Sequence, residues 1–181
     1  MAVHPAPEVL LRFYPCVPRM HALPCQHREP SPAPKEKRDL TMTTENSFSY
    51  DELQEGQQCE IKRQLQGSDI DAFAAASGDH NPLHTDADFA RAAGFEDRIA
   101  HGMLLASWIS ASLAHSLPGR GTVYLRQSLE FRQPALPGDA VLIRLTVAEK
   151  KRRGRVIIDC EICHEDGRCL LRGSAEVIAP S

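Results

Sequence analysis

The sequence has no strong excess of either charge and no segment that predicts a membrane span. Its 181 residues carry 21 Lys and Arg against 24 Asp and Glu, a formal net charge of −3. This balance argues against the basic surface that nucleic-acid binding requires. The stretch 101–114 carries no Asp, Glu, Lys or Arg. It is too short and too rich in Ser and Ala to cross a bilayer, which takes roughly twenty predominantly apolar residues.

The first 41 residues lack both hydrophobic periodicity and the apolar core of a secretory signal peptide. They hold eight of the thirteen prolines, and their four acidic residues argue against a mitochondrial presequence. We expect residues 1–41 to form a disordered, proline-rich extension that is not native, because Met42-Thr43-Thr44 resembles a natural start. Residues 42–181 would then form one cytoplasmic domain around a single hydrophobic core.

Hydrophobic patterns predict an α+β domain with about five strands and one central helix. The segments 58–65, 123–132, 140–149, 155–163 and 169–178 carry the alternating or β-branched apolar residues of strands. His101 to Ala114 is apolar on nearly every face, which indicates a buried helix. We therefore expect this helix to cover one face of an antiparallel sheet.

Two further helices are predicted before the central one. Ser68 followed by Asp71 resembles an N-cap with an acidic third position, opening a helix that ends near Gly78. A short second helix is expected from Asp86 to Ala93, stopped by Gly94.

Six cysteines raise the question of a metal site or disulfides. Cys160 and Cys163 have C-x-x-C spacing, but an odd separation on a strand points them to opposite faces. If Asp166-Gly167 is a two-residue hairpin turn, Cys163 opposes Leu170 rather than Cys169. We therefore expect free thiols, as in a reducing compartment.

The segment S-G-D-H-N-P-L-H, residues 77–84, is the clearest candidate for chemistry. Pro82 forces Asn81 out of the helical region, so that Asp79 and His84 can fold back toward each other as an acid–base pair. The simpler alternative is that Asp79 caps a turn and His84 is a surface histidine. His80 and His84 have H-x-x-x-H spacing, but Pro82 argues against the helix that would align them on zinc, and no metal is expected.

Gly102 stands at the expected start of the buried helix. Backbone N–H groups at a helix N-terminus lack intrahelical acceptors, and the helix dipole is positive there. This position could therefore receive an oxygen that carries negative charge.

Together these motifs resemble the MaoC-like hydratase family, and most closely the small R-specific enoyl-CoA hydratases that supply polyhydroxyalkanoate monomers. The resemblance runs from Phe73 to Val177 and rests on residues 77–84, F-E-D-R-I-A-H-G-M at 95–103 and Y-L-R-Q-S-L-E-F at 124–131. It implies a hot-dog fold, in which a curved antiparallel sheet wraps one long helix. It also implies a homodimer with joined sheets and no cofactor beyond the coenzyme A of the substrate.

The resemblance assigns roles to seven residues. Asp79 would be the base that takes a proton from water, His84 would hold that water, and the Gly102 N–H would polarise the thioester carbonyl. The residues expected to bind substrate are Asn81, His101, Ser110 and Leu113; Asn81 is also expected to fix the loop. Ser110, Leu113 and Leu117 share one helical face by their spacing, and a buried Ser110 hydroxyl would need a partner. The alternative for the two leucines is ordinary core.

Three other functions stay open. Dehydration of 3-hydroxyacyl groups on an acyl carrier protein is the same chemistry on a thioester of a carrier protein instead of coenzyme A. A major group of hot-dog thioesterases places a carboxylate on the central helix, and residues 101–117 contain no Asp or Glu. A non-catalytic acyl-CoA-binding protein would have no use for the Asp79/His84 pair. The basic run at 150–155 predicts a solvated hairpin tip or, alternatively, a docking surface for coenzyme A phosphates.

Overall fold

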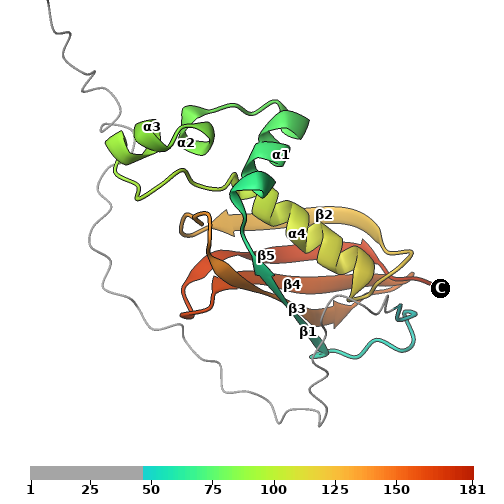
Figure 1. Ribbon diagram of the computed structural model, residues 1–181. Coiled ribbons are helices and arrows are strands. Elements are labelled where there is room, and N and C mark those ends of the chain that lie inside the picture. The colour runs from blue at the N-terminus through green and yellow to red at the C-terminus, as the bar shows by residue number, and fades with distance from the viewer. Residues whose placement is uncertain (1–46) are drawn as a thin grey trace, which may run out of the picture. The chain divides into compact units, whose positions relative to one another are not determined.

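The structure is a computed structural model that describes residues 47–181 (Figure 1). The expectations for residues 1–41 and for a start at Met42 lie outside this range. In chain order the elements are β1 (Gln58–Gln64), α1 (Gly67–Ser77), α2 (Pro82–Thr85), α3 (Ala87–Ala92), α4 (Gly102–His115), β2 (Val123–Phe131), β3 (Ala140–Lys150), β4 (Arg155–His164) and β5 (Cys169–Ile178). All five predicted strands and the central helix are present, within a residue or two at their ends.

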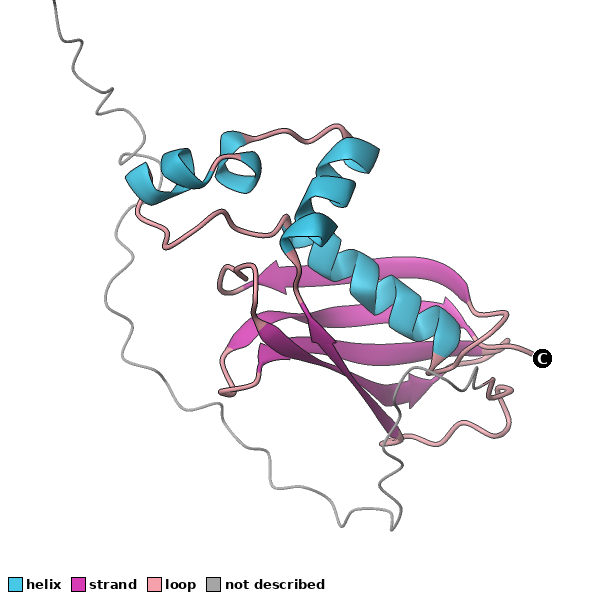
Figure 2. Ribbon diagram, in the orientation of Figure 1, coloured by secondary structure: helices cyan, strands magenta, loops and turns pink. Residues whose placement is uncertain are grey.

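One five-stranded sheet carries the fold, in the order β1-β3-β4-β5-β2, with every neighbouring pair antiparallel. Helix α4 lies across one face of this sheet (Figure 2). Alternate residues of the central strands point toward it and are buried: Val141, Ile143, Leu145 and Val147 in β3, and Val156, Ile158, Cys160 and Ile162 in β4. This alternation confirms the prediction that the helix covers one sheet face.

Helix α4 contributes its apolar side to the same core through Leu104, Leu105, Trp108, Ile109 and Leu113. The prediction of a buried helix is therefore confirmed for this face only, because the opposite face is exposed in the single chain at Met103, Ser107, Ser110, Ala111 and Ala114. Among the described residues, none of the helices has the length and hydropathy of a membrane span.

The N-terminus of α1 differs from the prediction. The cap is Gln66, whose backbone N–H donates to Asp69 Oδ2 at 2.9 Å, and Ser68 lies exposed inside the first turn. The spacing of Gln66 and Asp69 matches that of Ser68 and Asp71, so local sequence could not decide between the two frames. Gly78 ends the helix in the left-handed region at φ 75°, as predicted.

The β4–β5 hairpin also corrects the expected register. The His164 N–H donates to Arg168 O at 2.8 Å across a three-residue loop, in which Gly167 has φ 90°. The expected two-residue turn is therefore wrong, and Cys163 pairs with Cys169 rather than with Leu170. Cys160 lies in the core while Cys163 is half-buried, and all four cysteines of the described part are free.

Candidate active site

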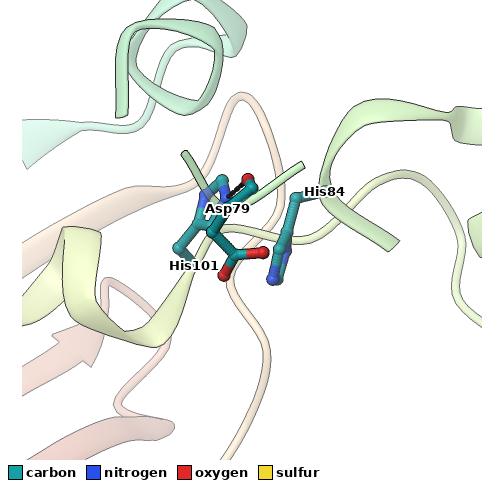
Figure 3. Close-up of side chains that lie close together, drawn as sticks. All are labelled: Asp79, His84 and His101. Carbon is teal, nitrogen blue, oxygen red and sulfur yellow. Dashed lines mark hydrogen bonds between the residues drawn. The ribbon is translucent and has the colours of Figure 1, made fainter. Parts of the chain in front are cut away.

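Three polar side chains meet where the α1–α2 loop approaches the N-terminus of α4 (Figure 3). Asp79, His84 and His101 can each offer one ligand atom, a carboxylate oxygen or a ring nitrogen, such that these atoms all lie within 4.8 Å of one another. Asp79 is exposed, His84 is half-buried and His101 is buried. The cluster is thus anchored in the protein and reachable from solvent.

Local backbone chemistry folds the loop back as predicted. Asn81 lies outside the right-handed helical region (φ −52°, ψ 127°), as expected for a residue before proline, and Pro82 then opens the single turn of α2. The Asn81 side chain accepts the Leu83 N–H at 3.1 Å and caps this turn. Asp79 Oδ1 accepts the Asn81 N–H at 3.2 Å. These bonds hold His84, on α2, close to Asp79.

His84 is oriented by a backbone carbonyl. Its Nδ1 lies 2.8 Å from Ile99 O, and because a carbonyl oxygen only accepts, Nδ1 carries the proton of this bond. In the neutral ring Nε2 then holds a lone pair. The Asp79 carboxylate lies beside the His84 ring (Figure 3). A water between them would find two acceptors for its two protons.

His101 contacts the other members of the site. It is the N-cap residue of α4, and its Nε2–H donates to the backbone oxygen of Asp79 at 2.9 Å. Its ring lies against His84, with centroids 3.8 Å apart, and against Phe73 on α1, with centroids 5.0 Å apart. His101 Nδ1 is buried and has no hydrogen-bond partner among the described residues.

Gly102 is the first residue of α4, where the backbone N–H has no acceptor four residues earlier within the helix. Phe131, at the end of β2, leaves no space for a side chain there. A Cβ on Gly102 would lie 2.7 Å from Phe131 Cε1, well inside van der Waals contact. Close approach of the ring, rather than an unusual backbone angle, therefore favours glycine at this position, and a larger residue would have to displace the ring.

Ser110 and Leu113 differ in burial. Ser110 is exposed in this single chain, whereas Leu113 is fully buried. The expectation of a buried Ser110 hydroxyl is wrong. The buried hydroxyl belongs to Ser112, which donates to Trp108 O at 2.7 Å, its own i−4 carbonyl. Residues three apart differ by about 60° around a helix, which is enough to place one at the boundary of the buried face and the other inside it.

Arg98 and Asp71 form an ion pair that no sequence motif indicates. Arg98 Nη1 lies 2.5 Å from Asp71 Oδ1, and Arg98 Nη2 donates to Gly67 O at 3.2 Å. The hydrogen bond from Arg98 lowers the pKa of Asp71. This pair ties α1, which carries Phe73, to the segment that leads into His101. The sequence predicts Asp71 as part of a helix cap, because local spacing does not reveal a partner 27 residues away.

The basic run at 150–155 forms the predicted hairpin tip between β3 and β4. Lys150 shares a sheet row with Val156, Val177 and Tyr124. Tyr124 and Phe131 are seven residues apart on β2, which is roughly 23 Å at the rise of a strand. Since Phe131 lies on Gly102, the basic run is remote from the site of its own chain, and docking of coenzyme A phosphates there finds no support within one chain.

An antiparallel sheet around one central helix is the architecture of the hot-dog class, and in this chain Asp79, His84 and His101 gather at the N-terminus of that helix. The chain matches the family model described as MaoC like domain over residues 47–163. It is 37% identical over 132 residues to a protein named (R)-specific enoyl-CoA hydratase from Rhodospirillum rubrum, covering 73% of this chain and 92% of that protein.

Two solved structures are similar over most of the described part. An R-hydratase from Pseudomonas aeruginosa has a TM-score of 0.72 at 41% identity and covers 75% of this chain and 87% of its own. An (R)-hydratase from A. caviae, involved in PHA biosynthesis, has a TM-score of 0.68 at 38% identity and covers 71% of this chain and 98% of its own. The chain belongs to the MaoC-like family, and the predicted hot-dog fold is confirmed.

Proposed function

We propose that this protein hydrates trans-2-enoyl-CoA thioesters to (R)-3-hydroxyacyl-CoA and catalyses the reverse dehydration. The observation that carries the proposal is the meeting of Asp79 and His84 beside the N-terminus of α4. Similarity to proteins named (R)-specific enoyl-CoA hydratase and R-hydratase supports the same reaction. The protein is accordingly a hydro-lyase.

In the proposed mechanism each step of the hydration has its own group. A water held between the Asp79 carboxylate and His84 Nε2 gives a proton to Asp79 as its oxygen attacks C3 of the enoyl group. The electron pair of the double bond moves toward the thioester oxygen, where the Gly102 N–H and the dipole of α4 stabilise the developing charge. The proton then passes to C2, which completes the addition of water.

This chemistry needs no cofactor beyond the coenzyme A of the substrate. Each proton moves between water, a carboxylate, an imidazole and carbon, and no electron leaves the reactants. Asn81 serves by capping the turn that carries His84. For Ser110 and Leu113 the proposed contact is with the acyl chain. Ser110 faces outward in the single chain, so its contact with substrate would lie on the open side of α4.

The functional unit that we propose is a cytoplasmic homodimer of one domain spanning residues 42–181. Strand β2 lies at the edge of the sheet and is exposed along most of its length. It presents Val123 and Phe131, each 51% exposed, together with Tyr124 and Leu125. An apolar edge strand is a template for pairing with another strand, and a second copy of β2 is complementary to it. Free cysteines fit a reducing compartment.

The test uses purified protein and crotonyl-CoA without added cofactor. Loss of the enoyl ultraviolet absorbance and formation of the R product support the proposal. Release of free thiol would indicate a thioesterase, although α4 contains neither Asp nor Glu. An S product would refute the stereochemistry. Comparing matched coenzyme A and carrier-protein thioesters distinguishes the hydratase from an acyl-carrier-protein dehydratase.

A further inference from the structure

The side chains of the site present three hydrogen-bond acceptors. The Ile99 carbonyl holds the proton of His84 on Nδ1, and the Asp79 carbonyl holds the proton of His101 on Nε2. In the neutral rings, His84 Nε2 and His101 Nδ1 therefore carry lone pairs. The Asp79 carboxylate adds an anionic acceptor, and one of its oxygens and one ring nitrogen of each histidine lie within 4.8 Å of one another.

His101 Nδ1 makes this arrangement unusual. The residue is only 2% exposed, and this nitrogen has no hydrogen-bond partner among residues 47–181. A buried acceptor without a donor costs roughly 1–3 kcal/mol, so such atoms usually serve a ligand, a water or a cation. Water cannot donate to three acceptors at once, because it has only two protons. A cation can serve all three.

Both histidine rings also make the hydrogen bond to a backbone carbonyl that is typical of metal-bound histidines. A ligating imidazole typically donates its other ring N–H to a carboxylate or a backbone carbonyl, which orients the ring and fixes the tautomer. His84 and His101 each make such a bond, at 2.8 Å and 2.9 Å. Thus two rings are preoriented with one nitrogen apiece available.

We propose that Asp79, His84 and His101 form a binding site for a divalent transition metal, with Zn²⁺ as its preferred test ion, and that the ion inhibits the enzyme. Two imidazole nitrogens and one carboxylate oxygen suit Zn²⁺, whereas Mg²⁺ and Ca²⁺ prefer oxygen ligands. Bonds of about 2.1 Å place tetrahedral ligands roughly 3.4 Å apart, so closure needs shifts on the order of 1 Å. The exposed Asp79 carboxylate can make such a shift, and it leaves the ion a path from solvent.

Inhibition follows from the chemistry of the same atoms, and this part rests on the proposed function. An ion bound there takes the lone pairs with which Asp79 and His84 would hold the water. It also fixes the Asp79 carboxylate as a ligand, which removes the base from the reaction. The enzyme would therefore be active without metal and would lose activity as the site fills.

Binding is measured on the full chain by equilibrium dialysis against zinc chloride in a non-chelating buffer. His101→Gln should bind one ion fewer than the wild type, or bind it about 100-fold more weakly. His80→Gln is the matched control, because His80 is exposed, stands four residues before His84 and is outside the cluster; it should bind as the wild type does. Asp79→Ala, a change at an exposed position, should also lose the ion if His101→Gln fails to fold. Magnesium chloride should not compete. Equal zinc binding by wild type, His101→Gln and Asp79→Ala would overturn the proposal.

Hydration of crotonyl-CoA is then followed as zinc chloride is added. Activity should fall in step with occupancy of the His101-dependent site and return when EDTA removes the ion. Zinc that fills this site without lowering the rate, or that raises it, would overturn the inhibitory role. A protein that binds zinc as described but never hydrates crotonyl-CoA would refute the proposed function while the metal site stands.

Discussion

The His101 ring joins the two motifs of the site by one bond, since its Nε2–H donates to the backbone oxygen of Asp79 across 2.9 Å. The same ring lies against His84, with centroids 3.8 Å apart, and His101 directly precedes the helix that begins at Gly102. One buried side chain, next to the start of α4, therefore contacts both Asp79 and His84. This relationship makes His101 a positioning residue in addition to any contact with substrate.

Replacing His101 by Phe should lower kcat about 100-fold with little change in KM. Phe keeps the stacked, buried ring but loses the hydrogen bond that holds Asp79, and a misplacement near 1 Å costs on the order of 10² in rate. Steady-state kinetics across pH should give a profile of unchanged shape, since Asp79 and His84 are retained. His80→Gln serves as the control and should keep the wild-type kcat. A His101→Phe enzyme with wild-type kcat would show that the bond to Asp79 does not matter.

Asp79→Asn and His84→Gln should each lower kcat by a factor on the order of 10² to 10⁴, because each removes a group that transfers or holds a proton. Neither should change the melting temperature appreciably, since Asp79 is exposed and His84 is half-buried. Crotonyl-CoA hydration and circular dichroism measure the two quantities. Full activity in either variant would exclude that residue from the mechanism.

Gly102→Ala should destabilise the fold by about 1–3 kcal/mol, because the new methyl group would overlap the Phe131 ring and force it to move. The effect should depend on that ring. In a Phe131→Ala background the same substitution should cost much less, because alanine is the better helix former once there is space. Urea unfolding of the four proteins of this double-mutant cycle measures the coupling. Additive effects would contradict a steric role for Phe131.

Asp71→Asn should lower stability at neutral pH but not in strong acid. Arg98 lowers the pKa of Asp71 below its ordinary value of 3.8, so the folded state binds this proton less readily than the unfolded chain. The contribution is therefore fully present above pH 3.8 and is lost as the pH falls through the lower folded pKa. Melting temperatures of wild type and variant should differ by a constant amount from pH 7 to 5 and converge below about pH 4. Asp88→Asn, in the exposed pair with Arg91, is the control and should differ little from wild type at any pH.

Leu125→Lys should convert the proposed dimer to a monomer. A lysine on an exposed edge strand opposes pairing with another edge, and the two-fold arrangement would introduce it twice. Light scattering coupled to size exclusion measures the mass, and Ala92→Lys, at an exposed position on α3, controls for the added charge. A wild-type protein that elutes as a monomer would contradict the dimer, whatever the variant does.

Local sequence was enough to predict the five strands, the central helix and the fold-back of residues 77–84, but not the single turn α2 that carries His84. Alternating residues such as Ile143 and Leu145 identify strands, and the apolar run after His101 identifies a buried helix, because these periods are properties of the chain itself. The fold of the loop followed from one steric fact, that Pro82 excludes Asn81 from the helical region. Roles for Asp79, His84 and Gly102 came from the family resemblance, and they stay predictions.

Only the tertiary structure decided which residues outside the loop complete the site. By spacing alone, His84 pairs with His80 in a possible metal motif, which Pro82 argues against. The fold instead brings His84 together with His101, 17 positions further along the chain. In the folded chain Ser110 is also exposed, Ser112 is buried, and Arg98 pairs with Asp71. The physical reason is common to all three. Periodicity indicates that a helix has a buried face, but the boundary of that face and every long-range partner depend on how the helix packs on the sheet.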